Sequence, residues 1–268
     1  MPELPEVESY RAYLEAHGMG RRILRVDVRR PGALRTTSVA ALARSLAGRA
    51  LISTRRHGKY LFGRVRGAGW IVMHFGMNGY LASADDLTAD AVGRAHAAVT
   101  LRFARDGALS FVDPRTFGRF DLVDSPDGFV RRQGLGVDAL EASAADFTRL
   151  FDVRRGGLKA LLMDQRAIAG IGNLYADEVL FHAGLHPWTG VPSLSAAERA
   201  RLYRATGKVL REAIARRAGP EPDRLPRTHL TPHREAGTRC PSCGGRIATL
   251  QAAGRTTYYC RRHQRPVV

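Results

Sequence analysis

The chain is poor in cysteine and lysine, and it has no long apolar run. It holds three cysteines in 268 residues, and all of them lie in the last segment, 240–268. So few thiols exclude the disulfide framework of a small secreted domain. No stretch approaches the roughly 18 apolar residues of a membrane span, and the acidic N-terminus lacks an apolar signal core. These absences predict an intracellular protein with no membrane segment, whose thiols bind a metal.

The charge of the chain is strongly unbalanced. Lys and Arg total 42 against 25 Asp and Glu, which gives a net charge of +17, and only three of the basic residues are lysines. Such a charge suits a polyphosphate partner, because the release of counterions drives binding. Compositional drift toward arginine and alanine in a soluble protein would give the same numbers. With 44 % hydrophobic residues, there is enough apolar material for the cores of two domains.

The cysteines form a regular pattern near the C-terminus. It reads Cys-x2-Cys, residues 244–259, then Cys-x2-His, and the four candidate ligands are Cys240, Cys243, Cys260 and His263. This spacing is typical of a zinc site. Between the pairs, RIATL (246–250), QAAG and RTTYY (255–259) indicate a β-hairpin whose turn carries the cation Arg255. A loose tail with unpaired thiols is the alternative.

The rest of the chain divides by pattern. Residues 3–18 predict a helix that Gly18 can stop. Short β-rich runs follow at 22–28, 50–54, 59–65, 70–75, 98–103 and 108–113, which favours a β-sandwich or barrel. After about residue 130 the pattern becomes helical. One helix opens with Ser195 and Glu198 in capping-box register, presents Leu202, Thr206, Val209, Leu210 and Ile214 on one face, and is closed by Gly219.

We therefore predict an α+β chain with four parts. An N-terminal helix and β-sandwich would occupy 1–130, a helical domain 131–219, an exposed Pro- and Arg-rich loop 220–235, and the metal-bound hairpin 236–268.

The first residues, Met1-Pro2-Glu3, carry possible chemistry. If Met1 is removed, Pro2 becomes a secondary amine, and an α-amino group titrates near about 7.7–8.0, so part of it is neutral at pH 7. A neutral amine can attack a sugar C1′ and form an iminium, and Glu3 beside it could donate or shuttle a proton. By themselves, these residues are better explained as an ordinary start followed by a helix.

The wider sequence resembles the bacterial formamidopyrimidine-DNA glycosylase and endonuclease VIII family. The matching strings are MPELPEVE at the start, GKYL (58–61), HFGMNG (74–79), DPRTFG (113–118), LLMDQRAIAGIGNLYADEVLF (161–181), GLHP (184–187) and the terminal hairpin, all in the family's order. The resemblance implies that the string 161–181 forms a helix-two-turn-helix motif in the helical domain. It also implies damaged double-stranded DNA as the partner, a monomer, and a bacterial cytoplasmic protein that joins the nucleoid when bound to DNA.

The resemblance also implies roles for single residues. Pro2 would be the nucleophile and Glu3 the general acid, while Glu6 would shape the junction of the domains and the lesion pocket. Lys59 would meet a DNA phosphate near the nucleophile; without the resemblance, a surface lysine is the alternative. Arg255 would clamp the phosphates that flank the lesion.

Four more residues would handle the duplex. Asn173 would hold phosphate beside backbone N–H groups, a role compatible with a helix cap. Met77, Arg115 and Phe117 would fill the gap left by the flipped base. Taken alone, Met77 and Phe117 would more often be core residues, but both lie in turn-rich motifs, which favours exposure.

The sequence departs from the family pattern in two places. His263 stands where the family usually has a cysteine, and imidazole can replace thiolate at a tetrahedral zinc ion. Segment 215–239 is shorter than the family's loop over 8-oxoguanine and does not match it. Hydantoins, oxidised pyrimidines or a bulky adduct are therefore open as substrates.

We predict a bifunctional DNA glycosylase and abasic-site lyase with one structural zinc, which breaks the strand by β- and δ-elimination. The alternative is a DNA-binding protein that senses lesions or abasic sites without cutting.

Overall fold

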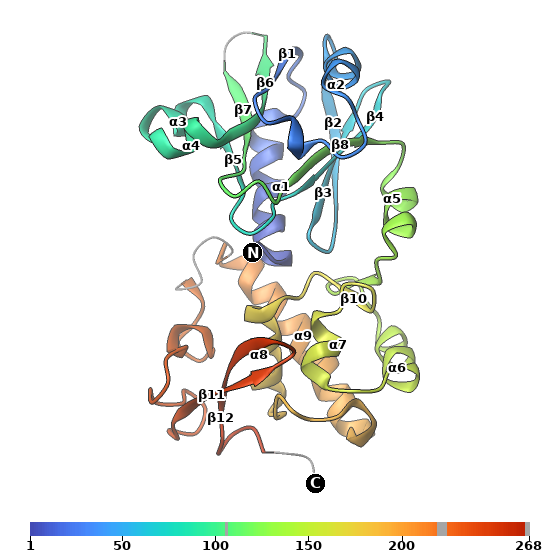
Figure 1. The fold of residues 1–268 in the computed structure, drawn as a ribbon. Coiled ribbons are helices and arrows are strands. Elements are labelled where there is room, and N and C mark those ends of the chain that lie inside the picture. Colours follow the sequence, from blue (N-terminus) through green and yellow to red (C-terminus); the bar gives the residue numbers. More distant parts are fainter. Residues whose placement is uncertain (105–106, 219–223, 266–268) are drawn as a thin grey trace. The chain divides into compact units, whose positions relative to one another are not determined.

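A computed structural model describes residues 1–104, 107–218 and 224–265 (Figure 1). The chain forms two compact units. One comprises Met1–Pro2 and Val7–Gln133, and the other comprises Glu3–Glu6 and Gly134–Val268. The first boundary predicted from the sequence lies at 130/131, and the finer division into 131–219, 220–235 and 236–268 stays a prediction. No helix in the described part of the chain is both long and apolar enough to cross a membrane.

The first unit contains two four-stranded antiparallel sheets. One has the order β1-β6-β7-β5 and the other β2-β3-β4-β8. The strands of the first sheet are β1 (Ile23–Val28), β6 (Ala97–Phe103), β7 (Ala108–Val112) and β5 (Tyr80–Ser83). Those of the second are β2 (Leu51–His57), β3 (Tyr60–Val65), β4 (Gly69–His74) and β8 (Arg119–Val123).

The two sheets share one core. Leu101 from the first sheet and Ile71 from the second belong to the same hydrophobic cluster, together with Val7 and Leu14 of helix α1 (Leu4–Gly18). Inward side chains of both sheets thus meet as in a β-sandwich. The predicted α+β class, with an N-terminal helix on a sandwich, is confirmed.

Several elements of this unit were not predicted. They are strands β5 and β8, and helices α2 (Val39–Leu46), α3 (Ala84–Ala89), α4 (Ala91–His96) and α5 (Pro126–Gln133). β5 and β8 are short and follow the turn-rich strings around 74–79 and 113–118, which mask a period-2 pattern. Ser38 and Ser83 accept backbone N–H bonds at the starts of α2 and α3. Capping residues therefore mark the starts of these short helices, which apolar periodicity alone does not reveal.

The second unit is helical around its own core. Its helices are α6 (Ala144–Val153), α7 (Leu158–Met163), α8 (Asn173–Ala183) and α9 (Ala196–Ala215), with a two-stranded parallel pair of β9 (Val137–Asp138) and β10 (Ile168–Ala169). The turns between α7 and α8 make the predicted helix-two-turn-helix. α8 is buried almost all round and lies behind the C-terminal hairpin in Figure 1.

Helix α9 begins as predicted. Ser195 accepts the N–H of Glu198, and the Glu198 side chain accepts from Ser195 in return. Leu202, Thr206, Val209 and Leu210 of the predicted face are buried. The helix ends at Ala215, earlier than predicted, and Gly219 lies outside the described residues.

The C-terminal hairpin is formed by β11 (Ile247–Ala252) and β12 (Arg255–Cys260). The predicted four-residue turn QAAG is shorter in the structure. Only Ala253 and Gly254 connect the strands, with φ of 51° and 67°, as the twist of a two-residue hairpin requires. Arg255 is consequently the first residue of a strand, paired with Ala252, rather than part of the turn.

The prediction of an exposed loop at 220–235 is wrong for its second half. Residues 219–223 lie outside the described residues, but Leu225, His229, Leu230 and Thr231 are buried. Glu178 of α8 holds this segment, because its carboxylate accepts the N–H groups of Leu230 and Thr231, each at 2.8 Å. A buried carboxylate needs such donors, and no local sequence pattern indicates that they come from this loop.

Candidate catalytic and nucleic-acid site

Glu3 lies at the N-terminus of helix α8. Its carboxylate accepts the N–H groups of Gly172 (2.5 Å), Leu174 (2.9 Å) and Tyr175 (3.3 Å), and the residue is 5 % exposed. These are the amides that a helix start leaves without partners, and the helix dipole favours a negative charge there. Glu3 is therefore held in place as an anion.

A close backbone approach fixes this position. The N–H of Leu4 donates to the carbonyl of Gly170 at 3.0 Å. Gly170 has φ of +119°, and a Cβ there would lie 2.7 Å from Leu4 Cδ1. Only glycine satisfies both conditions. Gly170 of the GIG string therefore allows Leu4 to approach closely, and this contact fixes the position of Glu3 before it.

Glu6, unlike Glu3, is held in its uncharged form. Burial, and secondarily the charge of Glu3, raises the pKa of Glu6 from 4.5 to about 8. Its Oε2 accepts the N–H of Glu3 at 2.6 Å, and the hydroxyl of Tyr175 donates to its Oε1 at 3.3 Å. At neutral pH, Glu6 is thus a protonated carboxyl group next to an ionised one.

Asn173 takes part in a buried network that the sequence analysis missed. The ammonium group of Lys159 is 2.8 Å from Asn173 Oδ1, 2.5 Å from Thr257 Oγ1 and 2.6 Å from Asp177. The Nδ2 group of Asn173 donates to Thr256 O at 3.3 Å. Lys159 is 1 % exposed, and burial lowers its pKa. The only sequence signal was the rarity of lysine in this chain.

This network ties the hairpin to the helix. Arg234 pairs with Asp177 at 2.9 Å and lies over the ring of Tyr258, whose N–H donates to Asp177 at 3.1 Å. The start of α8 and strand β12 are therefore locked together by charged groups.

Met77, Arg115 and Phe117 lie on two turns of the first unit, and all three side chains are exposed. Met77 is 44 % and Phe117 56 % exposed, which excludes the interpretation of either as a core residue. The guanidinium of Arg115 lies 5.4 Å from the ring centroid of Phe117.

The two turns touch. Gly76 has φ of +56°, and a Cβ there would lie 2.8 Å from the backbone of Phe117 and Gly118. Asp113 accepts the N–H of Gly118 at 2.8 Å, which closes the second turn. Two apolar side chains and one cation thus project from adjoining turns.

Lys59 lies with Gly58 in the turn between β2 and β3, and it is 5 % exposed. Burial, followed by the charge of Lys59, lowers the pKa of His74 to about 4. The neutral ring of His74 accepts the N–H of Gly76 through Nδ1 at 3.2 Å. Lys59 is therefore not a surface lysine.

Pro2 is half-buried, and Met1 before it is 59 % exposed. While Met1 is attached, the nitrogen of Pro2 is an amide with no basic lone pair. Pro2 can be a nucleophile only in a chain whose first residue has been removed.

Three of the four predicted metal ligands come together. The sulfurs of Cys240, Cys243 and Cys260 lie within 4.8 Å of one another, and those of Cys243 and Cys260 are 3.5 Å apart. A Cβ on Gly245 would sit 3.3 Å from both of these sulfurs, so the hairpin base leaves room for them. Three converging thiols are a donor set that could bind a metal ion such as zinc.

His263 is adjacent to this group but outside it. Its Nε2 is 2.8 Å from Phe181 O, and its Nδ1 is 3.1 Å from the hydroxyl of Ser242, in the loop between the first two cysteines. A metal-binding histidine commonly donates its second ring N–H to a backbone carbonyl, which is the contact that Nε2 makes here.

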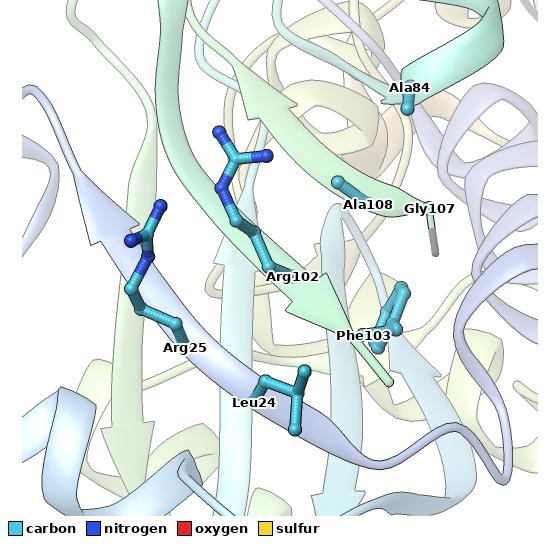
Figure 2. Close-up of a pocket in the computed structure, with 7 residues that line it drawn as sticks. All are labelled: Leu24, Arg25, Ala84, Arg102, Phe103, Gly107 and Ala108. Atoms are coloured by element: carbon cyan, nitrogen blue, oxygen red, sulfur yellow. The ribbon is translucent and has the colours of Figure 1, made fainter. Parts of the chain in front are cut away.

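The described surface also has a pocket of about 430 Å³ on the first sheet, shown in Figure 2. Arg25 of β1 and Arg102 of β6 stand beside each other in it, and both are paired with Asp27, at 2.8 and 2.5 Å. None of the predicted site residues lines it. Asp27 compensates one of these two positive charges.

Comparisons with known proteins give one answer along the whole chain. Residues 1–120 match the formamidopyrimidine-DNA glycosylase N-terminal domain, and residues 135–221 match the H2TH domain of the same enzymes. A formamidopyrimidine-DNA glycosylase of Pelotomaculum thermopropionicum is 35 % identical over 97 % of this chain and 98 % of its own. That of Pelobacter propionicus is 36 % identical over 98 % of this chain and 100 % of its own.

Solved structures agree. The Lactococcus lactis Fpg in complex with an abasic site containing DNA has a TM-score of 0.86 and 27 % identity, covering 98 % of this chain and 99 % of its own. The same bacterium's Fpg with a FAPY-dG containing DNA has a TM-score of 0.85 and 28 % identity, with the same coverage. The chain belongs to the formamidopyrimidine-DNA glycosylase family.

Proposed function

We propose that this protein is a DNA glycosylase and abasic-site lyase of base excision repair, acting on damaged double-stranded DNA. The observation that carries the proposal is the pair of buried carboxyl groups, Glu3 and Glu6, that follow Pro2 in the first turn of the chain. Glu3 is held as an anion by the start of α8, and Glu6 keeps its proton to about pH 8. An amine followed by one ionised and one protonated carboxyl group is suited to forming and resolving a Schiff base.

In the first step, the freed nitrogen of Pro2 attacks C1′ of the damaged nucleotide. The C1′–base bond breaks and the base leaves with the bonding electrons. The sugar ring opens and the nitrogen becomes a positively charged iminium, which withdraws electrons from the sugar. A proton can then leave C2′, the C3′–O bond breaks, and loss of a further proton expels the 5′-oxygen.

These steps need a proton for the ring oxygen or the leaving base. Glu3 is the residue next to the nucleophile, but its three N–H donors stabilise the charged form. We propose that Glu3 shuttles protons during ring opening, while Glu6, whose Oε2 accepts the N–H of Glu3 at 2.6 Å, keeps a neutral carboxyl at its side. Ionising Glu6 would place a second negative charge beside Glu3 and hinder its role.

The remaining predicted residues would hold the duplex. Met77 and Phe117 would occupy the space of the flipped base, and Arg115, lying over Phe117, would bond the partner base. Asn173 and Arg255 would contact phosphates at the helix start and the hairpin tip. We propose the same contact for Lys59, which the turn around Gly58 holds in a buried position.

Zinc would be held by Cys240, Cys243 and Cys260, and we propose His263 as the fourth ligand through Nδ1. The ion would staple the base of the hairpin, and with it the register that puts Arg255 at its tip. For this, Nδ1 of His263 would exchange the hydroxyl of Ser242 for the metal, while its Nε2–H keeps Phe181 O.

Borohydride trapping tests the nucleophile. Protein with an N-terminal tag, removable by a protease that leaves Pro2 first, should give no covalent adduct with abasic-site DNA before cleavage and a full adduct after it. If tagged protein is trapped at the same rate as cleaved protein, Pro2 is not the nucleophile. Cleaved protein that binds DNA without trapping would instead favour the non-catalytic lesion-binding alternative.

Glu3→Gln separates proton transfer from binding. Excision should fall by roughly 100-fold or more, the range for loss of general acid–base catalysis, while DNA affinity stays close to that of the parent. Because Glu3 also caps α8, thermal unfolding of the variant is measured alongside. A loss of DNA binding equal to the loss of excision would assign Glu3 a structural role only.

A further inference from the structure

A second cluster of metal-ligating side chains lies in the helical unit, on elements other than the hairpin. Glu178 and His182 are one turn apart on α8, and His229 lies in the segment that leads to the hairpin. One ligand atom from each lies within 4.8 Å of the others. Glu212 of α9 also approaches the cluster, with Oε2 3.1 Å from Nε2 of His229.

The side chains of Glu178, His182 and His229 are mostly enclosed, whereas that of Glu212 is 37 % exposed. Glu178 is fully buried, His229 is 1 % exposed, and the side chain of His182 is 14 % exposed. The rings of the two histidines pack edge-on, with centroids 4.5 Å apart. Two imidazoles and a carboxylate rarely share a buried space unless something compensates for their desolvation.

The histidine nitrogens lack hydrogen-bond partners among the described residues. Nε2 of His182 and both ring nitrogens of His229 are buried without a hydrogen bond of acceptable geometry. Nε2 of His182 is 3.2 Å from Glu178 Oε1, and Nε2 of His229 is 3.1 Å from Glu212, yet neither contact is directed as a hydrogen bond should be. Buried polar atoms in native proteins are nearly always satisfied.

We propose that Glu178, His182, His229 and Glu212 form a second, structural zinc site. Two imidazole nitrogens and two carboxylate oxygens are a complete ligand set for tetrahedral zinc. Ligands about 2.1 Å from zinc are separated by about 3.4 Å at tetrahedral angles. The pairs His229–Glu212 and His182–Glu178 are close to this separation, at 3.1 and 3.2 Å. The ligand atoms of Glu178, His182 and His229 lie within 4.8 Å of one another, so binding would draw their more distant pairs together by up to about 1.4 Å.

The surroundings of Glu178 fit this role. Oε2 accepts the N–H and the hydroxyl of Thr231, at 2.8 and 2.6 Å, and Oε1 accepts the N–H of Leu230. Ligating carboxylates are characteristically held by such donors. The carboxylate is therefore oriented before any metal arrives, with one side of Oε1 facing His182.

The site would join three segments that are far apart in sequence. α8, α9 and the segment around His229 would be bound to one ion, independently of the cysteines. The ion would thereby hold both ends of residues 213–228 in place. This proposal does not rest on the proposed function, since it concerns the fold of the helical unit.

Metal content tests the proposal directly. Intact wild-type protein, purified without chelators, should carry two zinc equivalents by elemental analysis. His182→Ala should carry one, and so should His229→Ala. His17→Ala, a histidine of the first unit that stacks on Tyr13, is the matched control and should carry two.

Cobalt substitution identifies which site is filled and does not require any variant to fold. Titration of wild-type protein with Co²⁺ should show a first equivalent with thiolate-to-metal absorption and a second with only the visible bands of nitrogen and oxygen ligation. One equivalent of metal in wild-type protein, or two retained in folded His182→Ala, would overturn the proposal.

Discussion

Replacing Glu6 by glutamine isolates the effect of its shifted pKa on stability. The folded-state pKa of Glu6 is about 8, against 4.5 for the free carboxyl. Between these values the folded protein binds more protons than the unfolded chain. The stabilisation from neutral Glu6 is thus complete below about 4.5 and is lost as the pH rises through 8. Each pH unit in this window costs about 1.4 kcal/mol, or about 2.7 kcal/mol from pH 5 to pH 7.

Glutamine cannot ionise, and its carbonyl can still accept the N–H of Glu3 or the hydroxyl of Tyr175. Chemical denaturation of both proteins at several pH values should therefore show the stability of wild type falling relative to Glu6→Gln by about 2 to 3 kcal/mol over that range. Glu15→Gln, on the exposed part of α1, is the control and should follow wild type to within about 0.5 kcal/mol. A constant difference between wild type and Glu6→Gln would show that Glu6 is ionised at neutral pH, and the proposed pairing of one charged and one neutral carboxyl would fail.

Three further predictions concern the hairpin and the substrate. Arg255→Ala should keep the hairpin metal but weaken DNA binding, with the slope of log K against log salt smaller by about one unit; an unchanged slope would remove Arg255 from the phosphate contacts. His263→Ala should weaken cobalt binding in the thiolate-absorbing site, and full affinity there would place the fourth ligand elsewhere. With segment 215–239 as a poor lid, single-turnover excision of 8-oxoguanine opposite cytosine should be slower than that of a hydantoin or cleavage of an abasic site; 8-oxoguanine as the fastest of the three would contradict this.

The strands with continuous apolar runs, such as KYLFGRV and WIVMHF, were predictable because burial on one or both faces shows in the residue pattern. The helix α9 was predictable from its capping box. β5 and β8 were not, because each is a short strand that follows a turn-rich string, where alternation of apolar residues is hard to detect. The metal spacing predicted the three cysteines that converge, but spacing carries no information on ring orientation, so it could not show that His263 faces Phe181 and Ser242.

The electrostatic partners of the site were also beyond the sequence. Tyr175, Asp177 and Glu178 stand in one string that was matched as a motif, yet each side chain meets a different distant segment. Tyr175 meets Glu6, Asp177 meets Lys159 and Arg234, and Glu178 meets Thr231. Such pairings depend on which segments the fold brings together, and no local pattern records them.

The division of the chain places Glu3–Glu6 with the C-terminal unit, although Met1–Pro2 and Val7 onward belong to the other. A fragment ending near Gln133 would contain every residue of the N-terminal motif, yet Glu3 in it would have lost the amides of Gly172, Leu174 and Tyr175. By the same reasoning, a substitution in the turn between α7 and α8 would also alter the position of the Glu3 carboxylate. Gly170→Ala would place a methyl group against Leu4. It alters no group proposed to react, yet it would displace the carboxyl group of Glu3 from the start of α8.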